Sequence, residues 1–181
     1  MQVVNTDLVG LKVIIPKIWY DSRGYFFETY NAKQFERVEI DSTFVQDNES
    51  MSSYGVIRGL HYQTEPYAQG KLIRVIQGEV LDVLVDIRKD SRTYGSHLSI
   101  ILNDIGKKQI YVPPGFAHGY VVLSDTAIFA YKCTKTYNPH HEGGIKYNDP
   151  TLNIDWLIPN SDHIVSEKDK RLPLFGDHLQ N

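Results

Sequence analysis

The sequence has few of the features that mark secreted, zinc-stapled or membrane-spanning chains. It contains one cysteine, Cys133, in 181 residues. It therefore cannot form an intrachain disulfide or supply a cysteine zinc cluster. The N-terminal segment lacks the basic start and apolar core of a signal peptide, and no apolar run approaches the ~18 residues that span a bilayer. We expect a soluble, cytoplasmic protein of a reducing compartment, without a membrane partner.

Neither sign of charge is in large excess. The 19 Lys and Arg residues nearly balance 22 Asp and Glu, which gives a net charge of −3. This disfavours a nucleic-acid partner but leaves room for a local basic pocket. The composition, 41% hydrophobic and 23% charged, is that of an ordinary globular chain. At this length roughly 70% of the unfolded surface can be buried without a disulfide or metal, so we expect one domain over residues 1–181.

Turn signals rich in Gly, Pro, Asn and Asp separate short segments rich in Val, Ile, Tyr and Phe, as in an all-β sandwich or barrel. The turns lie at 21–24, 69–70, 77–78, 89–91, 103–106, 113–115, 124–125 and 138–139. Residues 80–88 alternate, with apolar side chains at odd positions and Asp82 and Asp86 at even ones. Residues 127–135 place Tyr131 on the face of Phe129 and Cys133, towards a core or a cavity.

Helical patterns are short and few. Residues 31–38 and the stretch after Ser166 are the two segments that look helical. Ser166 is a suitable N-cap, with Asp169 three residues later. We therefore predict an antiparallel all-β fold with a few short helices.

Three stretches are unusually polar for strands: 21–28, 46–71 with its interruptions, and 113–120. For 21–28 the favoured alternative is a turn that leads into an aromatic core strand. For 113–120, a rigid Pro-Pro-Gly turn delivers His118 to an apolar strand. A lone strand histidine is more often structural than functional, so this signal alone is weak.

The middle stretch carries the strongest signal. Gln46 and Asn48 share a face, as do His61 and Gln63, while Arg58 is out of phase with His61 unless Gly59 marks a β-bulge. Such a polar row is costly to bury unless it lines a wet, ligand-binding cavity. The alternative is a solvated outer face.

Acid–base chemistry suits the residue types in these stretches. Histidine is the usual general base near neutral pH, tyrosine can act as an acid, and lysine can stabilise an oxyanion. His61, Tyr131 and Lys71 would serve proton abstraction beside a carbonyl, if the fold brings them together.

Several motifs follow one another in the order found in a known family. They are Arg23-Gly24 with Glu28, Gln46-Asp47-Asn48, the string 58–63, Gln69-Gly70-Lys71-Leu72, the string 114–119, Tyr131-Lys132-Cys133 and Asn148-Asp149-Pro150. From about Leu11 to Pro173 the chain resembles the dTDP-4-dehydrorhamnose 3,5-epimerases of the cupin superfamily. The resemblance implies a cupin-type jelly roll, a homodimer that exchanges N-terminal strands, and no cofactor.

The resemblance also implies a reaction in dTDP-L-rhamnose biosynthesis. The substrate, dTDP-4-dehydro-6-deoxy-D-glucose, is inverted at carbons 3 and 5 to give dTDP-4-dehydro-L-rhamnose. By position, His61 removes the proton beside the 4-keto group and Asp169 orients it. Tyr131 returns a proton from the opposite face, and Lys71 stabilises the enolate.

A further set of positions is implied to contact the nucleotide sugar. These are Arg23, Glu28, Gln46, Asn48, Arg58, His118, Glu142 and Lys168. Arg23, Arg58 and Lys168 suit the diphosphate, because they form charge-assisted hydrogen bonds. Tyr137 is implied to stack on thymine, and Phe26 and Trp19 occupy pocket positions. Trp19 departs from the phenylalanine expected there.

Three rival functions differ in chemistry or outcome. A mono-epimerase of another dTDP-4-keto-6-deoxysugar would keep the same residues and invert carbon 3 or carbon 5 alone. A non-catalytic sugar-binding cupin would tolerate loss of His61 or Tyr131, which are both present. A metal-dependent cupin usually has a His-x-His pair, whereas Tyr62 and Gln63 follow His61 here and the pair His140-His141 is expected on a surface loop. We therefore predict no metal.

Overall fold

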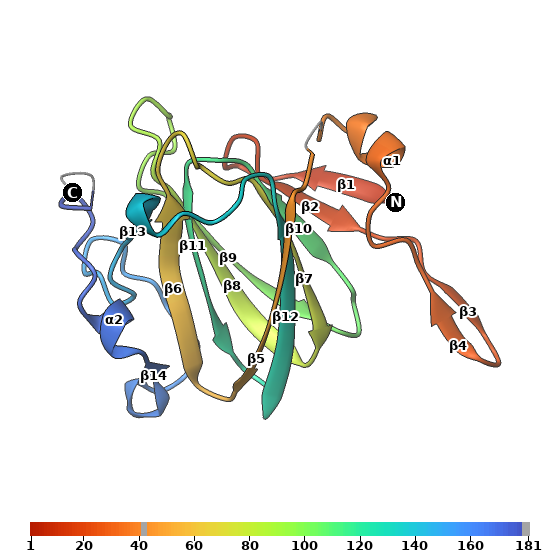
Figure 1. The fold of residues 1–181 in the computed structure, drawn as a ribbon. Coiled ribbons are helices and arrows are strands. Elements are labelled where there is room, and N and C mark those ends of the chain that lie inside the picture. The colour runs from red at the N-terminus through yellow and green to blue at the C-terminus, as the bar shows by residue number, and fades with distance from the viewer. Residues whose placement is uncertain (41–42, 179–181) are drawn as a thin grey trace.

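The computed structural model describes residues 1–40 and 43–178, most of which form two facing β-sheets (Figure 1). Among the described residues, one sheet has the order β1 (Gln2–Asn5), β2 (Lys12–Ile15), β10 (Gln109–Val112), β7 (Lys71–Gln77), β12 (Thr126–Cys133) and β5 (Gln46–Ser53). The other has the order β13 (Glu142–Gly144), β6 (Val56–Gln63), β11 (Phe116–Val122), β8 (Glu79–Asp86) and β9 (His97–Asn103). The predicted all-β sandwich is confirmed, except that β14 (Ile164–Val165) pairs with β6 in parallel.

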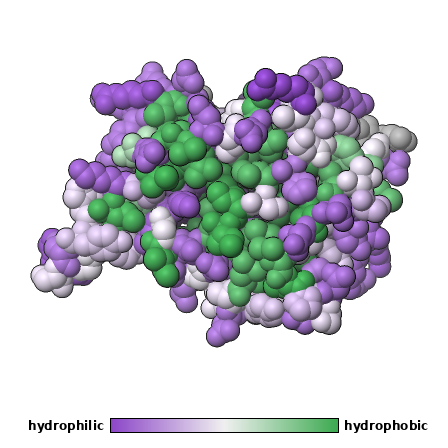
Figure 2. Space-filling view, turned by 180° about the vertical axis from the view of Figure 1, so that it is seen from behind, coloured by the Kyte–Doolittle hydropathy of each residue, from purple (hydrophilic) through white to green (hydrophobic). Residues whose placement is uncertain are grey.

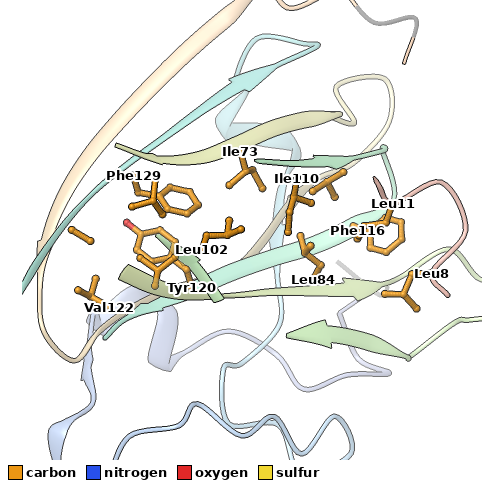
Figure 3. Close-up of a cluster of buried hydrophobic side chains, with 14 residues drawn as sticks. Leu8, Leu11, Ile73, Leu84, Leu102, Ile110, Phe116, Tyr120, Val122 and Phe129 are labelled. Atoms are coloured by element: carbon orange, nitrogen blue, oxygen red, sulfur yellow. The ribbon is translucent and has the colours of Figure 1, made fainter. Parts of the chain in front are cut away.

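Apolar side chains from both sheets meet in the interior (Figure 3). Ile73 of β7, Leu84 of β8 and Ile110 of β10 are fully buried there. Burial of each such side chain contributes about 1.5–3 kcal/mol. Tyr120 of β11 and Phe129 of β12 lie towards one end of this cluster, where their rings stack at 4.2 Å between centroids.

The outer face of the second sheet is covered by the chain that follows β13, which runs beside β6 in Figure 1. Leu81 and Val83 of β8 pack there in one cluster with Ile145 and Trp156. The alternation of residues 80–88 separates the two faces of β8 as predicted, but both faces are buried. Asp82 is consequently a fully buried carboxylate in the middle of a central strand.

Two short helices form where the sequence predicts them. Asn31 caps α1 (Ala32–Glu36) and Ser166 caps α2 (Glu167–Lys170), each by accepting a hydrogen bond from a backbone N–H three residues later. Two 3₁₀ turns, Pro139–His141 and Asn160–Asp162, are not evident from the sequence pattern. None of the helices in the described part of the chain is long and apolar enough to cross a membrane.

A small hairpin projects from the sandwich near the N-terminal strands (Figure 1). Its strands are β3 (Trp19–Asp21) and β4 (Gly24–Phe26), joined by the predicted turn. The favoured alternative for residues 21–28, a turn that leads into an aromatic core strand, is wrong, because Tyr25 is 55% and Phe26 67% exposed.

Figure 2 shows the molecule from behind, with apolar side chains gathered in the middle of that face.

Candidate active site

A cavity of about 570 Å³ lies between the two sheets and is closed on one side by the 164–169 segment. Its walls are built from β5, β6, β7, β11 and β12, so distant parts of the sequence contribute side chains to one space. Predicted site residues line it: Arg58, His61, Lys71, His118, Tyr131, Lys168 and Asp169. Of the polar row singled out in the sequence, Arg58, His61 and Lys71 line this cavity, whereas Gln46, Asn48 and Gln63 do not.

A bulge in β6 brings Arg58 and His61 to the same cavity. The pairing with β11 shifts, so that His61 faces His118 while Arg58 faces Tyr120. The extra β6 residue changes the alternation between Arg58 and His61. Gly59 permits this, because it has φ of +128° and a Cβ there would lie 2.5 Å from the Cα of Gly119. The bulge that the sequence left open at Gly59 is therefore present.

His61 and Asp169 form a hydrogen-bonded pair across the cavity wall. The His61 Nε2 to Asp169 Oδ1 distance is 2.8 Å, and Asp169 Oδ2 accepts from the N–H of Gly59 at 3.3 Å. Burial alone raises the pKa of Asp169, but the His61 and Gly59 hydrogen bonds outweigh it and hold that pKa below its usual value. Because the carboxylate is charged, Nε2 carries the hydrogen and the Nδ1 lone pair of His61 is left as the basic site.

A second histidine–aspartate pair lies beside the first. His118 Nε2 is 2.7 Å from Asp82 Oδ1, and both side chains are buried. Burial lowers the pKa of His118 more than Asp82 raises it, so the ring is neutral near pH 7. Sequence reasoning missed Asp82; its signal was a carboxylate on the same strand face as Val80 and Leu84.

Lys71 and Tyr131 lie together on the opposite sheet. The Lys71 Nζ is 5.9 Å from the centroid of the Tyr131 ring. Burial lowers the pKa of Lys71, an effect that Cys133 and Asp82 oppose. Burial also raises the pKa of Tyr131, so this phenol holds its proton at neutral pH. The cavity thus combines an imidazole bonded to a carboxylate, a protonated phenol and a buried lysine.

A hydrogen-bonded group of rim residues connects β5, β13 and α2. Lys168 Nζ contacts both carboxylate oxygens of Glu142 at 2.7 Å, and the Tyr137 hydroxyl donates to Glu142 at 2.8 Å. Gln46 accepts from the backbone N–H of Tyr137 and donates to Asn48. The structure therefore brings these five predicted residues together beside the cavity.

The four N-terminal predictions lie elsewhere in this chain. Arg23 is at the tip of the projecting hairpin, where it pairs with Asp21, and Trp19 and Phe26 face each other across the hairpin strands. Glu28 follows the hairpin and accepts hydrogen bonds from Asn31 and Gln34. None of these four is among the cavity-lining side chains of the described residues.

Two hydroxyl residues of β5 were missed. Ser50 lines the cavity and bonds the Tyr120 hydroxyl at 2.9 Å, and Ser52 accepts from Arg58 Nε at 3.1 Å. Both continue the face of Gln46 and Asn48, so strand alternation was the available signal.

The described residues contain no group of three His, Cys, Asp or Glu side chains placed to hold a metal ion.

The fold and cavity define an acid–base enzyme built on an antiparallel jelly roll. An imidazole paired with a carboxylate, a phenol and a lysine share one cavity, and these are the groups that acid–base chemistry beside a carbonyl requires. The model of the dTDP-4-dehydrorhamnose 3,5-epimerase family matches residues 5–177, and the chain belongs to this family of isomerases.

Relatives match along nearly the whole chain. The dTDP-4-dehydrorhamnose 3,5-epimerase of Shigella flexneri is 48% identical over 178 residues, covering 98% of this chain and 97% of the relative. The crystal structure of the Elizabethkingia anophelis enzyme of that name is 50% identical with a TM-score of 0.94, covering 98% and 97%. A Legionella pneumophila 3,5-epimerase, solved with dTDP-4-keto-L-rhamnose, is 48% identical with a TM-score of 0.93, covering 97% and 93%. These likenesses confirm the predicted fold class and family.

Proposed function

We propose that this protein converts dTDP-4-dehydro-6-deoxy-D-glucose to dTDP-4-dehydro-L-rhamnose, the 3,5-epimerisation step of dTDP-L-rhamnose biosynthesis. The observation that carries the proposal is the His61–Asp169 pair in one cavity with Tyr131 and Lys71, in a member of the 3,5-epimerase family. The 4-keto group of the substrate makes the hydrogens on carbons 3 and 5 acidic, so one base can act at both.

In each half of the reaction, His61 Nδ1 takes the proton from the carbon beside the carbonyl. The electron pair of that C–H bond forms a C=C bond to carbon 4 of the sugar. The π electrons of the 4-keto group move onto its oxygen, which becomes the enolate oxygen. Asp169 stabilises the imidazolium, because its carboxylate is 2.8 Å from Nε2. The Lys71 ammonium stabilises the enolate oxygen, and burial makes this charge interaction stronger than in water.

Tyr131 supplies the new proton. It lies on β12 in one sheet, whereas His61 lies on β6 in the other, so a ring held between them meets acid and base from opposite sides. The enolate collapses, the carbon takes the phenol proton, and its configuration inverts. His61 loses its proton to water and Tyr131 regains one before the second carbon reacts.

The diphosphate is bound by basic residues at the cavity. Arg58 forms no ion pair with any residue that the structure describes, so its charge is available to an anion. Lys168 is held by Glu142 and is shared with the incoming diphosphate. Gln46, Asn48, His118, Glu142 and Tyr137 complete the nucleotide-sugar contacts.

The active assembly is a homodimer in which each hairpin serves the cavity of the other subunit. Arg23, Glu28, Trp19 and Phe26 belong to the expected substrate contacts, yet none of them lines the cavity of its own chain. The β3–β4 hairpin projects from the sandwich (Figure 1). An exposed aromatic hairpin is also the kind of surface that subunit contacts bury.

Incubation with dTDP-4-dehydro-6-deoxy-D-glucose in heavy water tests the function. We expect deuterium at carbons 3 and 5 by proton NMR and mass spectrometry, and an L-configured product that a downstream reductase traps. Deuterium at one carbon would indicate a mono-epimerase. If neither carbon exchanges its hydrogen, the protein would be a sugar-binding module and the proposal would be overturned.

A further inference from the structure

One face of β5 carries a row of polar side chains, each bonded to a residue of the cavity or its rim. Gln46 accepts from the Tyr137 backbone, Ser50 bonds the Tyr120 hydroxyl, and Ser52 accepts from Arg58. Ser52 is only 6% exposed, and Arg58 is its hydrogen-bond partner within the described residues. The next residue, Ser53, points to the exposed face.

The Ser52 hydrogen bond orients the Arg58 guanidinium, which forms no ion pair with any residue that the structure describes. Arg58 donates its Nε hydrogen to Ser52 Oγ at 3.1 Å, which leaves both Nη groups available to a ligand. The planar guanidinium binds an anion best with two parallel N–H donors, so the orientation of its plane determines the quality of the contact. An arginine without this bond would lose more side-chain entropy when it is ordered by a ligand.

We propose that Ser52 is a positioning residue that sets the Arg58 guanidinium for the diphosphate of the nucleotide sugar. Its contribution is to binding rather than to proton transfer, because Ser52 lies behind Arg58 and is not a cavity-lining residue. The inference rests on the proposed function, since it requires a nucleoside diphosphate as the ligand.

Titration calorimetry with dTDP, combined with steady-state kinetics, tests this role. In Ser52→Ala we expect the Kd for dTDP and the KM to rise roughly three- to tenfold, the effect of losing one intramolecular hydrogen bond of ordinary net strength. We expect kcat to stay within about twofold. Ser53→Ala is the matched control, a serine truncation on the same strand, and should behave as wild type.

A double-variant cycle separates positioning of Arg58 from general weakening of the fold. In an Arg58→Met background, adding Ser52→Ala should cause no further loss of dTDP affinity. A further loss as large as that in the wild-type background would overturn the inference. If Ser52→Ala does not fold, Ser52→Cys keeps the size of the side chain with a poorer acceptor and should show the same loss.

The two proposals fail in different ways. Wild-type affinity for dTDP in folded Ser52→Ala, with normal epimerisation by the wild type, would overturn the role of Ser52 alone. Failure of the wild type to bind dTDP or exchange deuterium would overturn the proposed function, and the inference with it.

Discussion

In the proposed mechanism, turnover depends most directly on His61. We expect His61→Ala to reduce kcat at least about 10³-fold, because the cavity loses its base. The fold should survive, since the His61 side chain is 33% exposed and leaves little space unfilled. A coupled assay with the downstream reductase measures kcat, and a thermal unfolding curve serves as the control. Retention of most of the activity would show that another group removes the proton.

In the proposed mechanism, Tyr131 returns the proton. Tyr131→Phe keeps the ring that packs near Phe129, with 6.1 Å between ring centroids, but removes the acidic hydroxyl. We expect slower turnover and an accumulation of sugar inverted at one carbon, since water must replace the acid. NMR of the product mixture measures this. A rate and product equal to those of the wild type would make Tyr131 a packing residue only.

Much of this site could be predicted at the residue scale, since a base, an acid and an amine follow from side-chain types in ordered motifs. Asp82 was missed although it shares a strand face with Val80 and Leu84, because an aspartate in an alternating strand normally indicates a solvated face. Its burial depends on His118, which arrives from another strand. Ser50 and Ser52 carry too little chemical signal to be distinguished before their partners on β11 and β6 are known.

At the scale of elements, a buried carboxylate holds the loop between β8 and β9. Asp86 accepts hydrogen bonds from Arg88, Ser91 and Thr93. Burial alone raises the pKa of Asp86, but these donors outweigh it and lower the value from 3.8 to about 2. Folding therefore favours the charged carboxylate and gains about 2 kcal/mol above pH 4.

This contribution must disappear in acid. We expect Asp86→Asn to be less stable than wild type at pH 7 by about 2 kcal/mol, with the gap narrowing as the pH falls from about 4 to about 2. Urea unfolding across this pH range measures the gap. A gap that is the same at every pH would mean that the charge of Asp86 does not contribute.

The strands and helix caps were accessible to sequence reasoning because they depend on local spacing. Alternation located β8 and β12, and Ser166 located α2. The second buried face of β8 was not accessible, because the chain that covers it comes more than fifty residues later. The parallel pairing of β14 and the exposure of the β3–β4 hairpin likewise depend on which segments lie beside them. A local sequence pattern cannot predict those neighbours.

At the scale of the whole molecule, the position of the hairpin determines whether each subunit has a complete active site of its own or contributes residues to the site of its neighbour. The sandwich supplies His61, Tyr131 and Arg58, the proposed base, acid and diphosphate ligand, from its own chain. Arg23 lies in the turn between β3 and β4, and this hairpin projects from the sandwich (Figure 1). If the hairpin serves the partner's cavity, an Arg23 defect and a His61 defect on different subunits damage the same cavity. The other cavity of that mixed dimer is intact.

Mixing two impaired variants therefore tests the dimer. We expect Arg23→Ala and His61→Ala, unfolded together in equal amounts and refolded, to recover ~25% of wild-type activity, because half of the dimers are mixed and each has one intact site. Refolding each variant alone is the control and should give only its own residual rate. If the hairpin serves its own subunit, each mixed dimer has two damaged sites, and activity would not exceed the average of the two variants. Size-exclusion chromatography of the refolded sample checks that dimers have formed.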